Sequence, residues 1–352
     1  MSRPKVLVAF DSMRYPNTGL FHFGKSLGRA LLRKNADKFD LNFFLHPKTT
    51  EFDADNVPII RLRKYHKLFY FNTHKIELFH FTDQLPRLAP AKVGGKKILT
   101  IHDINPVHEA PGSKAEAYYL KKLSSHIRHC DRVVAISQFA ANDVLKYFPK
   151  IKDKLSVIYN GADKLQVTPG HSPAYVPNKP FLFAIGIVSA KKNFAVLPAL
   201  LAGNDRELVI AGIKTPYEAE IMAEAIKHGC ADRVTITGPV SEADKAWYYS
   251  NCEAFVFPSI AEGFGLPVIE AMHFGKPVFC SNYTSLPEVA GDAAYYFDSF
   301  RAEAMRKVFN KGMQHFHQNN GAEKAIAHAA KYNWDYTAKQ YLALYTECLA
   351  GR

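Results

Sequence analysis

The stretch AFVFPSIAEGFGLPVIEAMHFGKPVFCSN, residues 254–282, decides the fold of this 352-residue chain. It begins with a short apolar run, AFVFPS (254–259), and ends with another, PVFCSN (277–282), and each has the length and composition of a buried strand. A glycine-rich loop and a helical segment lie between them, and Pro267 suits the first turn of that helix. A strand, a helix and a second strand in this order predict a βαβ unit of a parallel sheet.

The same alternation of apolar runs and helical segments continues along the whole chain. In the first half, strands are predicted at 5–10, 40–45, 57–62, 76–81, 97–103, 132–137 and 155–160. In the second half, they are predicted at 181–188, 207–212, 233–238, 254–259 and 277–282. Because helical patterns separate these strands, the fold class is α/β, with a doubly wound parallel sheet in each half.

Residues 163–180 interrupt this alternation. The segment DKLQVTPGHSPAYVPNKP contains four prolines and has no apolar periodicity, which is typical of a linker or domain boundary and makes it a candidate hinge. We therefore expect two Rossmann-like domains, at 1–165 and 166–334, that face each other across a cleft. Residues 331–352 have the apolar spacing of an amphipathic helix.

Composition excludes several classes of protein. Hydrophobic residues make up 47% and charged residues 22% of the chain, which indicates a folded globular protein rather than a disordered one. The five cysteines are far apart and form no CxxC pair, so neither a zinc site nor a disulfide framework is indicated. No apolar stretch approaches the roughly 20 residues that span a bilayer. A cytoplasmic location is expected, with no metal and no cofactor.

The net charge of +12 is concentrated in the first half of the chain. Residues 1–165 contain 28 Lys and Arg against 15 Asp and Glu, whereas residues 166–352 contain 17 against 18. A basic half favours an anionic partner such as a phosphorylated lipid carrier, a membrane surface or nucleic acid. A basic charge that serves solubility alone gives the same pattern.

The segment RLRKYHKLFYFNTHK (61–75) interleaves basic and aromatic residues. This composition suits a phosphorylated lipid or the inner leaflet of a membrane, and equally an ordinary solvated strand edge. The residues assigned to acceptor or membrane contact are Arg61, Arg63, Lys64 and Lys67. Basic and aromatic residues also suit nucleic acid, but no recognition motif for it is present, so that partner is not expected.

Two glutamates frame the glycine-rich loop of the opening stretch. Glu262 lies on the loop, and Glu270 lies eight residues later inside the predicted helix. The glycines allow the backbone to approach a ligand, and free N–H groups at the helix start can bind sugar hydroxyls or phosphate oxygens. Carboxylates accept hydrogen bonds from hydroxylated rings. The motifs of dinucleotide, P-loop and serine-hydrolase sites are missing from the sequence.

These residues resemble the EX7E motif of glycosyltransferase family 4, a retaining family with the GT-B fold. Further segments that are similar to this family are IGIVSAKKN (185–193), a phosphate-contacting loop, and the stretches 100–109, 157–163, 233–259 and 285–298. The resemblance covers most of residues 97–350. It implies that the C-terminal helix, 335–352, packs back on the N-terminal domain.

The resemblance also implies roles for individual residues. Glu262, His102 and Lys192 are the implied catalytic residues, with Glu262 on the transferred sugar and Lys192 on the diphosphate. Glu270 is implied to bind the ribose. The donor-binding set is Gly19, Lys191, Lys192, Gly238, Val240, Gly263, Phe264, Gly265, Leu266 and Glu270.

Three features depart from the family pattern or compete with it. Ile187 stands where many relatives have arginine, and Ala190 replaces a frequent proline, so Lys191 is expected to supply the missing charge. His102 alone is more readily a core histidine, and with Asp103 beside it at a strand end the two interpretations are equal. Asp53 and Asp55 form a DxD pattern that resembles a metal-binding motif of another glycosyltransferase fold, but the pattern is common by chance.

The expected function is transfer of a hexose from a nucleotide sugar to a glycan or lipid-linked acceptor in cell-surface polysaccharide synthesis. GDP-mannose is the favoured donor. The alternatives are a UDP-sugar donor, a phosphorylase or epimerase on the same fold, and a non-catalytic module that binds sugar or nucleic acid.

Overall fold

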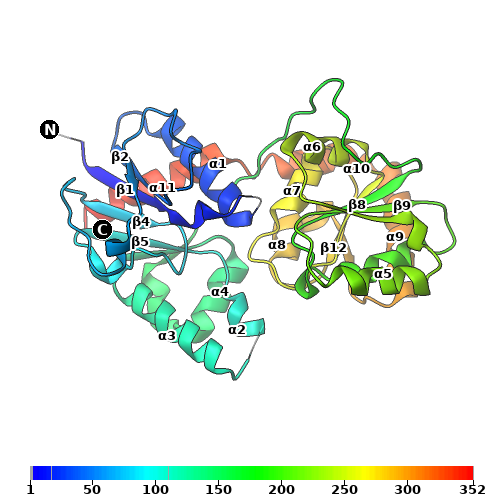
Figure 1. Ribbon diagram of the computed structural model, residues 1–352, viewed down its shortest axis with the longest axis horizontal. Coiled ribbons are helices and arrows are strands. Elements are labelled where there is room, and N and C mark those ends of the chain that lie inside the picture. Colours follow the sequence, from blue (N-terminus) through cyan, green and yellow to red (C-terminus); the bar gives the residue numbers. More distant parts are fainter. Residues whose placement is uncertain (1–2, 17, 110, 352) are drawn as a thin grey trace. The chain divides into compact units, whose positions relative to one another are not determined.

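The computed structural model describes residues 3–16, 18–109 and 111–351 and divides them into two units (Figure 1). Unit 1 contains the described residues up to Gly161 and those from Asn333 onward, and unit 2 is Ala162–Tyr332. Asn17, the first residue of the NTGLFHFG segment that contains Gly19, lies outside the described residues.

Unit 1 contains a parallel seven-stranded sheet with the order β3-β2-β1-β4-β5-β6-β7. The strands are β1 (Lys5–Phe10), β2 (Asp40–Leu45), β3 (Ile59–Arg61), β4 (Leu78–Phe81), β5 (Lys96–Ile101), β6 (Arg132–Ala135) and β7 (Leu155–Val157). Strand order reverses between β1 and β4, so this is a doubly wound sheet with its switch point there.

Five α-helices belong to the described part of unit 1. They are α1 (Gly19–Lys34), α2 (Asn105–Glu109), α3 (Lys114–Arg128), α4 (Gln138–Tyr147) and α11 (Trp334–Leu349). Short 3-10 helices are η1 (Asp11–Arg14), η2 (Lys64–Lys67), η3 (Pro90–Lys92) and η4 (Pro149–Lys154). The side chain of Thr18 caps α1 by accepting a hydrogen bond from the N–H of Phe21.

Helix α11 is held to the sheet of unit 1 by a buried polar network. His80 on β4 bonds to the hydroxyl of Tyr345 at 2.7 Å and to that of Thr100 at 2.9 Å, and Thr100 bonds to Tyr341 at 3.0 Å. Burial lowers the pKa of His80 to about 3, so its ring is neutral at physiological pH. The C-terminal helix is therefore a part of the core of unit 1.

Unit 2 contains a parallel six-stranded sheet with the order β10-β9-β8-β11-β12-β13. The strands are β8 (Phe181–Ile185), β9 (Glu207–Ala211), β10 (Val234–Gly238), β11 (Ala254–Phe257), β12 (Val278–Ser281) and β13 (Tyr295–Phe297). The helices are α5 (Glu218–Lys227), α6 (Glu242–Asn251), α7 (Leu266–His273), α8 (Leu286–Ala290), α9 (Ala302–Gln318) and α10 (Gly321–Ala329). The 3-10 helices are η5 (Ala190–Lys192), η6 (Phe194–Leu201), η7 (Ala231–Arg233) and η8 (Gly291–Ala293).

The boundary between the units, at Gly161 and Ala162, lies directly before the proline-rich segment 163–180, which belongs to unit 2. The segment contains no helix or strand, but it is fastened to unit 2 along its length. His171 pairs with Asp244 at 2.7 Å, and Tyr175 accepts a hydrogen bond on its carbonyl from Tyr248 at 2.7 Å. Prolines prevent regular backbone pairing but leave the side chains of this segment free to pack against unit 2.

The chain passes between the units twice, and the two crossings are adjacent. The N–H of Ala162 donates to the carbonyl of Tyr332 at 3.1 Å. A Cβ added at Gly161 would lie 2.2 Å from the backbone N of Trp334, so only glycine fits there.

Candidate active site

Three glycines lie at the carboxyl ends of neighbouring strands in unit 2. Gly186 follows β8, Gly212 follows β9 and Gly238 ends β10, and all three have positive φ, at 153°, 133° and 84°. A Cβ on Gly212 would lie 1.9 Å from the carbonyl oxygen of Gly186. The N–H of Gly212 donates to the carbonyl of Gly238 at 2.8 Å. This edge of the sheet therefore presents backbone rather than side chains, at the place where open α/β sheets bind ligands.

Lys192 and Glu262 meet at this edge, although 70 residues separate them. The Nζ of Lys192 lies 2.5 Å from Oε1 of Glu262, and each side chain is 14% exposed. The ammonium group also lies 4.9 Å from the ring centroid of Phe257, the last residue of β11. A cation and a carboxylate that are mostly withdrawn from water hold each other in a fixed position.

Buried residues from the following segment fix the loop that carries Glu262. The hydroxyl of Ser285, which is fully buried, donates to the carbonyls of Glu262 at 3.0 Å and Phe264 at 3.1 Å. Thr284 accepts the N–H of Glu262 at 3.1 Å. These three hydrogen bonds fix the backbone of the loop at Glu262 and Phe264.

Helix α7 begins directly after this loop. Gly265 has φ of 99°, and a Cβ there would lie 2.5 Å from Cδ2 of Leu286, so glycine is required at this position. Leu266 and Pro267 then form the first turn, and Gly263 lies beside Glu262 in the loop. Only three residues therefore separate the start of the helix from Glu262, the partner of Lys192.

Glu270, inside α7, is bound by two residues of α6. Its Oε1 accepts from Lys245 at 3.0 Å and its Oε2 accepts from the hydroxyl of Tyr249 at 2.9 Å. Burial alone would lower the pKa of Lys245, but the carboxylates of Glu270 and Glu242 raise it overall. Burial and then Glu270 raise the pKa of Tyr249, so both partners keep their protons and continue to donate.

The remaining donor residues of unit 2 lie near the same strand ends. The carbonyl of Lys191 accepts from the N–H of Ile260 at 2.9 Å and from the hydroxyl of Ser259 at 3.1 Å, which ties η5 to the end of β11. Ile187 is 40% exposed. Val240 is half-buried just beyond Gly238.

The predicted site residues of the first half lie in unit 1. The Nε2–H of His102 donates to the carbonyl of Thr82 at 2.8 Å, and its ring packs edge-on against Phe23 of α1 at 4.5 Å. Gly19 is the first residue of α1, and nothing lies within 4 Å of a Cβ placed on it. His102 is thus held by α1 and by the end of β4.

The sequence did not indicate that Asp11, directly after β1, carries a buried carboxyl group. Asp11 is 2% exposed, and its Oδ2 accepts the N–H of Arg87 at 2.8 Å, while Oδ1 has no hydrogen-bond partner among the described residues. Burial raises the pKa of Asp11 to about 6, with the nearby charge of Asp83 adding to the effect.

The basic residues 61–67 and the DxD pattern lie in the same part of unit 1. Asp53 pairs with Arg61, so one of the two DxD carboxylates already has a cationic partner. Within the described ranges, no group of three or more His, Cys, Asp or Glu side chains is placed to hold a metal ion. Arg63, Lys64 and Lys67 are exposed.

Sequence reasoning missed Lys245 and Tyr249, the two partners of Glu270. Their i, i+4 spacing places them on one face of a helix, and this signal was available in the sequence. The spacing does not reveal that both side chains bind Glu270, because Glu270 lies on a different helix.

Two family descriptions match consecutive parts of the chain. Residues 28–164 match Glycosyltransferase Family 4, and residues 172–330 match Glycosyl transferases group 1. A serotype-specific mannosyltransferase WbdA of Escherichia coli is 30% identical over 254 residues, which cover 66% of this chain but only 30% of that protein. The O-antigen chain mannosyltransferase B of Escherichia coli is 26% identical over 71% of this chain and 70% of its own length.

Solved structures share the fold. The structure of Anabaena Alr3699/HepE in complex with UDP and glucose aligns with a TM-score of 0.76 at 16% identity, over 98% of this chain and all of that one. WaaG, a glycosyltransferase involved in lipopolysaccharide biosynthesis, aligns with a TM-score of 0.68 at 12% identity, over 97% of this chain and 99% of that one.

No helix within the described residues has the length and apolarity that a membrane span requires. Both family descriptions fall on doubly wound parallel sheets of the kind that GT-B proteins contain. The chain therefore contains a Glycosyltransferase Family 4 domain followed by a Glycosyl transferases group 1 domain, on the GT-B fold that it shares with solved glycosyltransferase structures.

Proposed function

We propose that the protein is a retaining hexosyltransferase that uses a nucleotide-sugar donor in the synthesis of a cell-surface polysaccharide. GDP-mannose is the favoured donor and mannose the transferred sugar, since the relatives quoted above are named mannosyltransferases. The acceptor is a glycan or a lipid-linked glycan. The observation that carries the proposal is the pair of Lys192 and Glu262 at the glycine-lined edge of unit 2.

The reaction breaks the bond between the anomeric carbon and the diphosphate oxygen and forms a bond from that carbon to an acceptor hydroxyl oxygen. Negative charge grows on the leaving diphosphate. Lys192 and Lys191 are the donors that stabilise this charge. In the proposed front-face route, the acceptor proton passes to the leaving phosphate oxygen, so no enzyme nucleophile is used.

Donor binding exchanges one partner of Lys192 for another. Without a ligand, its ammonium group is paired with Glu262. A diphosphate carries more negative charge than one carboxylate and competes for the same cation. Glu262 then accepts hydrogen bonds from the hydroxyls of the transferred sugar, which makes it a catalytic residue in this proposal.

Glu270 is proposed to bind the ribose hydroxyls of the donor. Lys245 and Tyr249 act as positioning residues, because they hold the carboxylate through both of its oxygens. A fixed carboxylate loses less conformational freedom when the donor binds. Gly238 and Val240, beside this region in the sequence, are proposed to contact the base.

Unit 1 is proposed to bind the acceptor, with His102 near the reacting groups. The exposed basic residues Arg63, Lys64 and Lys67 favour an anionic acceptor or the cytoplasmic surface of a membrane. The protein would then be cytoplasmic and attached peripherally. The DxD pattern has no place in this proposal, since Asp53 is already paired.

Thermal unfolding with GDP-mannose, UDP-glucose and the free nucleotides identifies the donor, because a ligand that binds only the folded state raises the melting temperature with concentration. The proposal expects Glu270→Ala to weaken donor binding, and Glu262→Ala to lower turnover more than donor affinity. Release of free nucleoside diphosphate distinguishes a transferase from an epimerase. Stabilisation by a UDP-sugar alone would change the donor, and a covalent glycosyl group on Glu262 would overturn the front-face route.

A further inference from the structure

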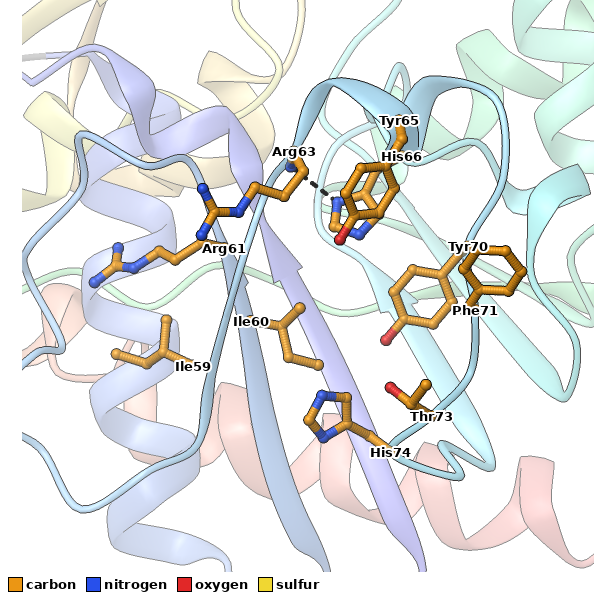
Figure 2. Close-up of a pocket in the computed structure, with 10 residues that line it drawn as sticks. All are labelled: Ile59, Ile60, Arg61, Arg63, Tyr65, His66, Tyr70, Phe71, Thr73 and His74. Carbon is orange, nitrogen blue, oxygen red and sulfur yellow. Dashed lines mark hydrogen bonds between the residues drawn. The ribbon is translucent and has the colours of Figure 1, made fainter.

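A pocket lies on unit 1 between the edge strand β3 and the segment that follows it (Figure 2). Its volume is about 400 Å³, which is within the range of small-molecule sites. It is lined by Ile59, Ile60, Arg61, Arg63, Tyr65, His66, Tyr70, Phe71, Thr73 and His74. None of these ten residues belongs to the donor-binding set described above.

One side of the pocket is cationic. Figure 2 shows Arg61 and Arg63 on the same side, away from Tyr70 and Phe71. Arg61 is held in place by the carboxylate of Asp53 and the carbonyl of Thr49. Arg63 is exposed, and no ion pair involves it within the described residues. The ten lining residues include no Asp or Glu, so the pocket favours an anion.

The other side is aromatic and contains a buried hydroxyl group. Tyr70 and Phe71 stand there, and Tyr65 lies near the top of the view (Figure 2). The hydroxyl of Tyr70 is buried and has no hydrogen-bond partner among the described residues, although buried hydroxyls are normally paired. Burial raises the pKa of Tyr70 to about 12, so the group keeps its proton. Because the hydroxyl oxygen has almost no surface open to solvent, a ligand oxygen pairs with it only after a neighbouring side chain of the pocket moves.

These features together describe one class of ligand. Guanidinium groups bind phosphate oxygens in a bidentate manner, and aromatic faces pack against the apolar side of a sugar ring. We infer that this pocket binds a phosphorylated sugar, which is the anionic end of a glycan or a glycolipid. Its identity as the acceptor of the transferase rests on the proposed function, whereas the binding itself does not.

A flat membrane surface is the competing occupant. Leu68 and Phe71 are 69% and 68% exposed in the same segment, and exposed apolar side chains next to lysines also suit a bilayer. A bilayer, however, contacts protruding side chains and does not enter a concavity that contains a buried hydroxyl group. The unpaired Tyr70 hydroxyl and the unpaired Arg63 therefore favour a small ligand.

The test measures binding of mannose 6-phosphate, mannose and inorganic phosphate to the full chain by calorimetry, and binding of phosphatidylcholine vesicles with and without phosphatidylglycerol by sedimentation. Arg63→Gln should weaken mannose 6-phosphate binding about tenfold, the loss of one strong charged hydrogen bond. The matched control is Arg128→Gln, an exposed arginine at the end of α3 that removes the same charge elsewhere on unit 1. It should leave the affinity unchanged.

A second variant separates the contribution of the Tyr70 hydroxyl group from that of the charge. Tyr70→Phe removes only the hydroxyl group and should weaken mannose 6-phosphate binding severalfold while the protein stays folded. Equal losses from Arg63→Gln and Arg128→Gln, binding of vesicles without binding of any soluble probe, or inorganic phosphate binding as tightly as mannose 6-phosphate would each overturn the inference. Donor binding, measured separately with nucleotides on the same variants, reports on the transferase proposal, so either one can fail alone.

Discussion

The two sheets of the molecule have the same architecture and opposite chemistry at their carboxyl edges. In unit 2, the neighbouring strands β8, β9 and β10 lead into Gly186, Gly212 and Gly238. In unit 1, the neighbouring strands β2, β1, β4 and β5 lead into His46, Asp11, Thr82 and His102. One edge therefore presents backbone, and the other presents side chains that can titrate or form hydrogen bonds.

The two units also differ in how their buried carboxylates are paired. In unit 2, the carboxylates of Glu262 and Glu270 are each paired with a lysine that is largely withdrawn from water. In unit 1, Asp11 is buried with one oxygen unpaired and a raised pKa. Unit 2 therefore holds these two carboxylates in paired, fixed positions, whereas unit 1 buries a carboxyl group whose ionised form is disfavoured.

The largest expected effect concerns the internal ion pair of unit 2. Lys245→Ala should lower the free energy of unfolding by about 4 kcal/mol, because it leaves the carboxylate of Glu270 buried without its cation. Urea denaturation measures the change. The control is Lys227→Ala, which breaks an exposed pair with Glu224 and should cost less than about 1 kcal/mol. Similar losses in both variants would mean that the pairing in unit 2 has no special role.

The next effect tests the glycine-lined edge. Gly212→Ala should lower the free energy of unfolding by about 3 kcal/mol, because the new Cβ would collide with the carbonyl of Gly186 and the φ of Gly212 is positive. Gly203→Ala is matched, because Gly203 also has positive φ but nothing within 4 Å of its Cβ position. Thermal unfolding should show the smaller shift for Gly203→Ala. Equal shifts would show that backbone conformation alone, and not close approach, requires glycine at this edge.

The smallest effect depends on pH and differs in sign between the units. The pKa of Asp11 is raised in the folded protein, so the folded state binds this proton more tightly and stability falls as pH rises from about 4 to about 6. Asp11→Asn should remove this loss and stabilise the protein by about 2 kcal/mol near pH 7. Urea denaturation as a function of pH measures it.

Asp244 in unit 2 supplies the opposite case. Burial would raise its pKa, but hydrogen bonds from Ser241 and His171 lower it overall. Its contribution to stability is therefore present above its ordinary pKa and is lost as pH falls below it. Asp244→Asn should destabilise the protein near pH 7, and the difference should disappear in acid. A stabilised Asp244→Asn variant would break the contrast between the two edges.

The order of elements was readable from the sequence because strands buried on both faces appear as continuous apolar runs. All twelve predicted strands overlap an observed strand, and the one that was missed, β13 (Tyr295–Phe297), is only three residues long. The family resemblance that rests on residues 258–282 is confirmed by the family descriptions. The contacts of segment 163–180 with the rest of unit 2 could not be predicted, since they depend on single residues such as His171 and Tyr175.

The site was only partly predictable for the same physical reason. Residue type and local spacing are enough to select Glu262, Lys192 and the loop glycines as candidate site residues. Lys245, Ser285 and Asp11 acquire their roles from burial and from partners on other elements, which local patterns do not encode. The roles assigned to Glu262, Lys192, His102, Gly19 and the other site residues stay predictions.

The adjacency of the two crossings at Ala162 and Tyr332 has a consequence for how the protein is made. Unit 2 is one uninterrupted stretch, whereas unit 1 is assembled from the two ends of the chain. During synthesis on the ribosome, the hydrogen bond between His80 and Tyr345 cannot form until α11 has been synthesised. Unit 2 has all of its residues by then, so the later part of the gene encodes the unit that can finish folding first.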